Sequence, residues 1–287
     1  MAKWTDGYWW SRDGLRLHYR DYAGPEDRPP ILCLPGLTRN ARDFAPVAER
    51  LAGQWRLICV DLRGRGESAY AKDPMTYVPL VYLQDVEALI AELRLDHIVA
   101  FGTSLGGILT MLLAAAGHAR IEGALLNDVG PAIESAGLAR IRGYVGRGGS
   151  WPTWLHAARV MGEVNGAAYP DYVTSDWLVM AKRLCRLTPA GRIVPDYDNR
   201  IAEPFRLPGG ETGVDMWATI DALRAAPTLL VRGELSDILS RSTAEEMGRR
   251  MPRLELLNLP RTGHAPTLDE PACRQAIDRL LDRVSAA

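Results

Sequence analysis

The chain has 287 residues, of which 47% are hydrophobic and 24% are charged, and its formal net charge is −1. This length suffices for one large domain or for a core plus an insertion, and the composition is that of an ordinary soluble globular protein. The near-neutral charge and the lack of a basic stripe argue against nucleic acid or an anionic membrane as a partner.

The beginning of the chain and its cysteines indicate the compartment. Residues 1–11 are polar and aromatic and lack the apolar region of a signal peptide, and no apolar stretch reaches the roughly 18 residues that a membrane-spanning helix needs. The four cysteines are far apart and show no C-x-x-C spacing: Cys33, Cys59, Cys185 and Cys273. We therefore expect a cytoplasmic protein with free thiols and no zinc site.

Short apolar segments alternate with amphipathic ones along most of the chain. Residues 14–22 alternate apolar and polar side chains, which predicts a half-exposed strand in a hairpin with residues 8–11. Buried strands are expected at 31–34, 56–62, 98–101, 121–129, 228–232 and 254–259, and helices at 41–51, 83–95, 108–116 and 270–284. Buried strands that alternate with helices predict a parallel sheet in an α/β fold.

The alternation breaks once, between Pro131 and about Ala226. This region holds helical segments rich in Trp, Tyr and Met, at 133–144, 151–162 and 175–186. We interpret residues 131–226 as an inserted helical cap over the C-terminal edge of the sheet, where open α/β sheets bind ligands. Residues 1–130 and 227–287 then form the core.

The sequence Gly102-Thr103-Ser104-Leu105-Gly106 lies between a predicted strand and a predicted helix. Gly-x-Ser-x-Gly in this context is typical of a nucleophile elbow, in which a sharp turn exposes the serine hydroxyl. Glycines flank the serine because side chains there would collide with neighbouring backbone. The N-terminus of the following helix favours negative charge near Ser104.

Five motifs in this order resemble those of α/β-hydrolase-fold serine hydrolases, in the branch of carboxylesterases, enol-lactonases and carbon–carbon bond hydrolases. They are residues 34–37, 61–68, 102–107, 233–237 and 263–264. The resemblance implies a mostly parallel eight-stranded sheet flanked by helices, a helical cap and a catalytic triad without cofactor or metal. The glycine-rich residues 61–68 lack the lysine and spacing of a phosphate loop and are interpreted as a structural turn.

Among the five histidines, only His264 lies in a loop after the last predicted strand, where it can act as the base for Ser104. Asp237 follows the strand at 228–232 and is the predicted acid that orients the imidazole. Asp128, after the preceding strand, is the alternative, since some members of the family use that position. If Asp128 is not the acid, its side chain can cap the turn at Gly130-Pro131.

The resemblance implies that the backbone N–H groups of Leu37 and Leu105 form the oxyanion hole. Relatives commonly have histidine where this chain has Pro35, so a side chain that braces the loop is absent. In the predicted cap, aromatic and sulfur side chains are candidate substrate contacts, with packing of the cap as the alternative: Tyr144, Trp151, Trp154, Met161 and Trp177.

These assignments predict a carboxylesterase-like hydrolase that cleaves a small carboxylic ester or lactone through an acyl-enzyme on Ser104. The expected substrate is a small molecule, apolar or aromatic. Carbon–carbon bond hydrolysis or amide hydrolysis by the same triad is the alternative, and Arg39 and Asn40 after the oxyanion loop leave it open. A ligand receptor that kept the fold is the non-enzymatic alternative. The pattern does not fix the oligomeric state.

Overall fold

The computed structural model describes residues 3–206 and 216–286. In this part of the chain eight strands form one sheet in the order β1-β2-β4-β3-β5-β6-β9-β10. The strands are β1 (Thr5–Trp10), β2 (Arg16–Tyr22), β3 (Ile31–Leu34), β4 (Leu57–Asp61), β5 (His97–Thr103), β6 (Arg120–Asn127), β9 (Thr228–Gly233) and β10 (Leu254–Leu259). From β4 to β10 the neighbouring strands are parallel, whereas β1 and β2 form an antiparallel hairpin at one edge. The predicted sheet and hairpin are confirmed.

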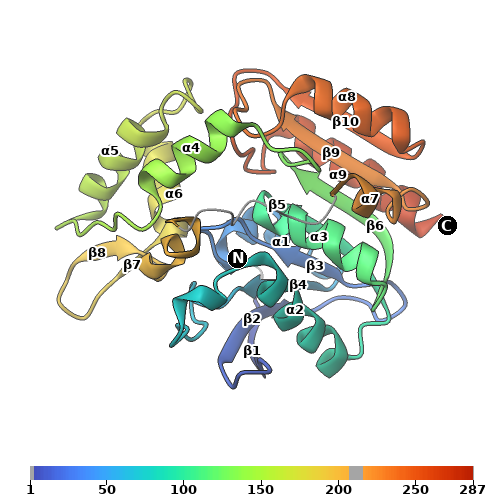
Figure 1. Cartoon of the computed structure of the whole chain (residues 1–287), viewed down its shortest axis with the longest axis horizontal. Coiled ribbons are helices and arrows are strands. Elements are labelled where there is room, and N and C mark those ends of the chain that lie inside the picture. The colour runs from blue at the N-terminus through green and yellow to red at the C-terminus, as the bar shows by residue number, and fades with distance from the viewer. Residues whose placement is uncertain (1–2, 207–215, 287) are drawn as a thin grey trace.

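Helices cover both faces of the sheet (Figure 1). One face carries α2 (Pro79–Leu93), α3 (Leu105–Ala116), α7 (Met216–Asp221) and α8 (Arg241–Arg250), and the other carries α1 (Ala45–Leu51) and α9 (Pro271–Ser285). A short 3-10 helix, η1 (Ala41–Phe44), precedes α1. Helix α2 begins earlier than expected because Pro79, with its fixed φ, occupies the first helical position.

Alternating residues of each strand supply the two halves of the core. In β3, Leu32 and Leu34 pack toward α2 and α3, whereas Ile31 and Cys33 pack toward α1 and α9. All four are fully buried, as the apolar run without alternation predicts for a parallel strand covered on both faces.

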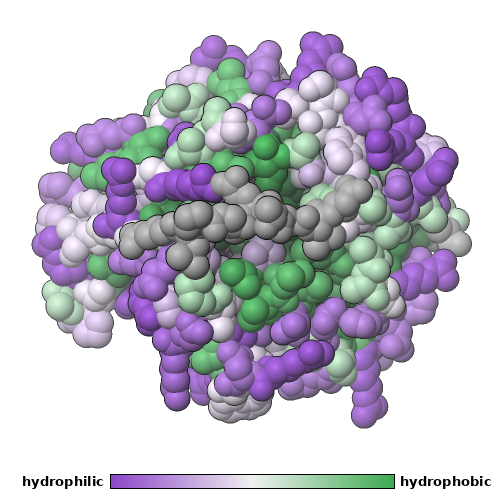
Figure 2. Space-filling view, viewed as in Figure 1, coloured by the Kyte–Doolittle hydropathy of each residue, from purple (hydrophilic) through white to green (hydrophobic). Residues whose placement is uncertain are grey.

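On the surface of the molecule, apolar side chains gather near the centre of the face shown in Figure 2, and polar side chains lie around its rim.

A second layer follows β6 and lies beside the ends of the central strands (Figure 1). It comprises α4 (Ser135–Tyr144), α5 (Trp154–Asn165), α6 (Thr174–Leu184) and an antiparallel hairpin of β7 (Cys185–Leu187) and β8 (Ile193–Pro195). We call residues 131–206 the inserted segment. The three helices match the predicted ones closely, whereas the hairpin was not predicted.

The predicted cap, residues 131–226, extends further than the inserted segment. Residues 207–215 lie outside the described residues. Helix α7, within the predicted range, packs on α3 of the sheet layer, where Ile220 and Leu223 are fully buried beside Met111. Helix α7 thus contacts a helix that covers the sheet, although it lies within the range predicted for the cap.

The inserted segment is fastened to the core by polar contacts. Arg42, in η1, donates to the carbonyl oxygens of Arg183 and Cys185 and to the Asp196 carboxylate. The hydroxyl of Tyr77 donates to Asp198 at 2.7 Å. Arg42 follows β3 and Tyr77 follows β4, so these contacts reach the inserted segment from the connections after two neighbouring strands.

Helix and sheet approach each other closely at the turn between β5 and α3. A Cβ added to Gly106 would lie 1.8 Å from the carbonyl oxygen of Leu34, and one added to Gly102 would lie 2.3 Å from that of Gly106. Neither backbone oxygen can move without breaking the sheet or the helix. Only glycine therefore fits at both positions, as the elbow motif predicts.

Residues 61–68 form a buried polar turn. The Asp61 carboxylate accepts from the backbone N–H groups of Ala41 and Glu67 and pairs with His18. Fully buried Arg63 pairs with Asp85. The interpretation of this glycine-rich stretch as a structural turn agrees with these contacts.

In the described part of the chain, no helix combines the length and the apolar character needed to cross a membrane.

The Gly106 contact yields a stability prediction. Gly106→Ala is expected to lower the free energy of unfolding by about 3 kcal/mol or more, because the new methyl group overlaps a backbone oxygen on β3. Gly143→Ala is the matched control, because Gly143 also lies in a helix, α4, and its new Cβ would meet nothing within 4 Å. Urea unfolding followed by circular dichroism measures both. Equal midpoints for Gly106→Ala and the unsubstituted protein would contradict the steric argument.

Candidate active site

Ser104 occupies the turn between β5 and α3 with φ 52° and ψ −115°. This conformation is strained for a residue with a side chain, and it is held by a hydrogen bond from the Ser104 N–H to the carbonyl oxygen of Asn127 at 3.0 Å. The helix that follows begins at Leu105. The hydroxyl of Ser104 therefore lies at the positive end of the α3 dipole.

His264 joins the serine to a carboxylate. Its Nε2 lies 2.8 Å from Ser104 Oγ, and its Nδ1 lies 2.8 Å from Asp128 Oδ2. Nδ1–H donates to the carboxylate when the ring is neutral, which leaves Nε2 free to accept from the serine. Three side chains that lie 24 to 160 residues apart thus form one chain of hydrogen bonds.

Asp128 is the carboxylate that the structure brings to the histidine. It follows β6 with φ 56°, and its side chain is fully buried. Besides His264 it accepts from the Gly233 N–H at 2.9 Å and from the Ser236 hydroxyl at 2.6 Å. These donors satisfy a buried carboxylate and fix its orientation.

Asp237, the predicted acid, lies in the loop after β9, next to Ser236. Its carboxylate pairs with Arg140 on α4, whose Nη2 donates to Oδ1 at 2.8 Å. The hydrogen bond from Arg140 lowers the pKa of Asp237, against the opposing effect of partial burial. The geometry therefore replaces Asp237 with Asp128 as the partner of the imidazole, because Ser236 and Gly233 turn toward Asp128 while Arg140 holds Asp237.

The loop after β3 lies beside the serine. A Cβ on Gly36 would be 3.7 Å from Ser104 Cβ, and Gly36 and Leu37 line the cavity above the serine. Within the described part of the chain, the Leu37 N–H donates no hydrogen bond. Leu105 is the first residue of α3, so its N–H has no partner within the helix. Leu105 directly follows Ser104, and Leu37 follows Gly36 in the loop beside the serine.

Arg65 braces this loop. Its Nε donates to the carbonyl oxygen of Leu37 at 2.9 Å, and its guanidinium lies over the ring of Tyr82 at 4.8 Å. The side chain is fully buried. Arg65 thus fixes the Leu37 peptide from behind, in a chain where Pro35 supplies no side chain for that purpose.

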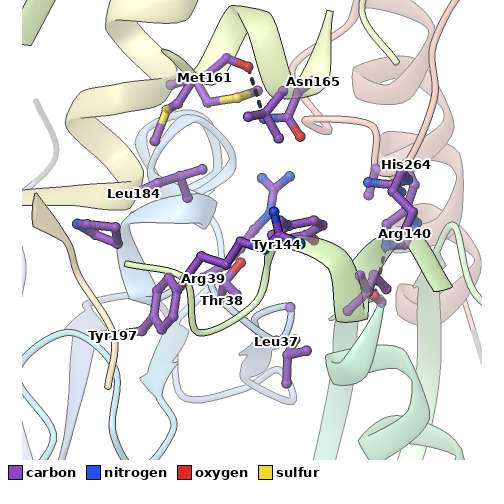
Figure 3. A pocket seen from close by; sticks show the side chains of 18 of the residues that line it. Leu37, Thr38, Arg39, Arg140, Tyr144, Met161, Asn165, Leu184, Tyr197 and His264 are labelled. Carbon is purple, nitrogen blue, oxygen red and sulfur yellow. Dashed lines mark hydrogen bonds between the residues drawn. The ribbon is translucent and has the colours of Figure 1, made fainter. Parts of the chain in front are cut away.

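A cavity of about 340 Å³ opens above Ser104 and His264. Figure 3 shows Leu37 and Thr38 on one side of it, Met161 and Asn165 on the opposite side, and His264 across from Leu184 and Tyr197. Its size suits a small ligand. It lies between the ends of the central strands and the inserted segment, as expected for an open α/β sheet.

Three of the five predicted substrate contacts line this cavity: Tyr144, Trp151 and Met161. Trp154 and Trp177 do not. Trp177 is buried and packs edge-on against Tyr169 and Tyr172, with ring centroids 5.8 and 5.0 Å away. Trp154 packs on the same cluster. Both tryptophans hold the inserted segment together.

Comparison with known proteins identifies the family. The model of the alpha/beta hydrolase family matches residues 31–275. The chain belongs to this family. A 3-hydroxybutyrate-oligomer hydrolase of Cupriavidus necator is 32% identical over 90% of this chain and 89% of the relative. A 2-(acetamidomethylene)succinate hydrolase of Mesorhizobium japonicum is 25% identical over 82% of this chain and 81% of the relative.

The solved structure of an alpha/beta hydrolase from Novosphingobium aromaticivorans is similar over its whole length. It is 60% identical, superposes with a TM-score of 0.95, and the match covers 99% of each chain. The resemblance stated from the motifs is confirmed, and so is the fold class. The chain is accordingly a hydrolase.

Two hydrogen bonds join the inserted segment to the loop of this α/β hydrolase that carries His264, and the sequence did not predict them. The Gly263 N–H donates to the carbonyl oxygen of Ala168, and the Tyr169 hydroxyl donates to that of Ala265, both at 2.6 Å. They flank His264 in sequence. The inserted segment therefore helps to hold the imidazole in place. No local sequence pattern predicts this role.

The sequence also did not predict that several cationic side chains line the cavity. Arg39, Arg140 and Arg147 all line the cavity. Of these three, the sequence pointed only to Arg39, because it follows the predicted oxyanion loop. Arg140 and Arg147 lie in the predicted cap, where the sequence does not indicate which way a side chain points.

The described residues contain no cluster of three or more His, Cys, Asp or Glu side chains that could hold a metal ion. The four cysteines are free and buried. Burial raises the pKa of Cys185 to about 12, so this thiol stays protonated at neutral pH.

The Asp237–Arg140 pair yields a prediction about stability and pH. The folded pKa of Asp237 is lower than its ordinary value of 3.8, so the pair stabilises the protein above that pH, and its contribution is lost as the pH falls through the lowered pKa. Both side chains are 34% exposed, so Asp237→Asn is expected to cost less than about 1 kcal/mol at pH 7.

Denaturant unfolding at pH 7 and pH 2.5 measures this effect, with Asp221→Asn, an exposed carboxylate on α7, as the control. The difference between Asp237→Asn and the unsubstituted protein should shrink at the lower pH. A difference that grows on acidification would refute the ion-pair account.

Proposed function

We propose that this protein is a serine hydrolase that cleaves a small carboxylic ester through an acyl-enzyme on Ser104. The observation that carries the proposal is the 2.8 Å contact between His264 Nε2 and Ser104 Oγ, in a serine held at the N-terminus of α3. The similarity to a hydrolase of 3-hydroxybutyrate oligomers, which are esters, favours an ester over other acyl bonds.

In the proposed mechanism, His264 Nε2 takes the proton of Ser104 as Oγ attacks the carbonyl carbon of the ester. The N–H groups of Leu37 and Leu105 stabilise the oxyanion. His264 then gives the proton to the departing alcohol, and a water molecule, activated by the same ring, releases the acid. Asp128 holds the Nδ1–H tautomer and stabilises the imidazolium.

Removal of the nucleophile tests the reaction. Ser104→Ala is expected to lower kcat for p-nitrophenyl butyrate by roughly 10⁴ to 10⁶, because the covalent route disappears. Ser242→Ala, an exposed serine on α8, should leave the rate unchanged. A fluorophosphonate should label the unsubstituted protein on Ser104, as mapped by mass spectrometry. Rapid hydrolysis by Ser104→Ala, or an adduct on another residue, would exclude this mechanism.

The assignment of the acid is tested by two isosteric changes. Asp128→Asn is expected to lower kcat by about 10⁴, because the amide favours the wrong tautomer of His264. Asn also tolerates the positive φ at this position. Asp237→Asn should lower kcat by less than about tenfold, since its carboxylate pairs with Arg140. The reverse order of the two effects would return the role to Asp237.

A further inference from the structure

The cavity wall has an unbalanced charge. Three arginines line it, at positions 39, 140 and 147, and among the described lining residues there is no aspartate or glutamate. The remaining wall is mostly apolar or aromatic. A cavity that displays guanidinium groups toward an otherwise apolar interior attracts an anionic group on its ligand.

Two of the arginines are compensated from outside the cavity. Arg39 pairs with Asp43 at 2.9 Å, and their side chains are 16% and 10% exposed. Arg140 pairs with Asp237, as described above. Neither carboxylate lines the cavity. These two guanidinium groups are fixed in orientation but contribute little net charge.

Arg147 is different. It lies in the loop after α4, between Gly146 and Gly148, which both have positive φ. It is exposed, and in the part of the chain that the structure describes no carboxylate forms an ion pair with it. Among the described residues that line the cavity, Arg147 is therefore the one cation without an ion-pair partner.

We propose that the substrate ester carries a free carboxylate and that Arg147 binds this carboxylate. This inference rests on the proposed esterase function and adds its substrate class, an ester with a second, ionised acid group. One uncompensated cation matches a monoanion better than a dianionic phosphate monoester. The planar guanidinium can donate two parallel hydrogen bonds to a carboxylate.

A pair of substrates isolates the charge. Mono-p-nitrophenyl glutarate and its methyl ester differ only in the ionised distal carboxyl group. The ratio of kcat/KM for the anionic ester to that for the neutral ester is expected to exceed one and to fall as the salt concentration rises. A ratio at or below one in the unsubstituted protein would overturn the proposal.

Arg147→Gln tests the residue. It is expected to lower that ratio by about tenfold, because the charge-assisted contact to the carboxylate is lost, mainly through a higher KM for the anionic ester. Arg159→Gln is the matched control, because Arg159 is exposed on α5 next to the lining residue Val160 but does not line the cavity. An unchanged ratio in Arg147→Gln, or an equal fall in Arg159→Gln, would refute a specific role for Arg147.

A binding experiment separates this inference from the esterase proposal. Calorimetry on Ser104→Ala is expected to show that monomethyl glutarate binds about tenfold more tightly than dimethyl glutarate, and that Arg147→Gln in the same background removes the difference. If neither p-nitrophenyl ester is hydrolysed, the esterase proposal fails while this measurement still decides the inference. Equal affinities for the two glutarates, or tighter binding of inorganic phosphate than of monomethyl glutarate, would refute it.

Discussion

The close packing of α3 against β3 and β5 is the constraint on which the site depends. Gly102 and Gly106 leave no space for a Cβ, so the chain turns sharply and Ser104 takes a positive φ. The same approach brings the start of α3 against the end of β3. The loop after β3 consequently lies beside the serine, and one local contact sets the position of both the nucleophile and the backbone donors around it.

The second determinant is the competition between two carboxylates at one sheet edge. Strands β6 and β9 are neighbours, so Asp128 and Asp237 both follow strands that end near His264. Donors decide between them. Asp128 is buried and accepts from Gly233, Ser236 and His264, whereas Asp237 is partly exposed and saturated by Arg140. A buried carboxylate without such donors would be costly, so the position that receives them becomes the partner of the imidazole.

The sequence predicts features that depend on neighbouring residues. It does not predict which side chains pair when they are far apart in the chain. The strands, most helices, the elbow and the position of His264 follow from apolar runs, glycines and motif order. The choice between Asp128 and Asp237 depends on Ser236 and Arg140, whose directions no spacing encodes. Trp177 illustrates the same limit in the inserted segment: a large aromatic residue serves a wall or a core equally well, and only packing against Tyr169 and Tyr172 decides it.

The inserted segment has two structural tasks that share residues. It supplies much of the cavity wall, and through Ala168 and Tyr169 it holds the backbone on both sides of His264. Tyr169 also lines the cavity. Because the inserted segment contacts both the cavity and the loop that carries His264, we expect a substitution that reshapes the wall near Tyr169 to move the imidazole as well. Arg147 lies in a loop that makes neither of these contacts to the histidine loop, so the charge of the cavity can change while the position of His264 is preserved.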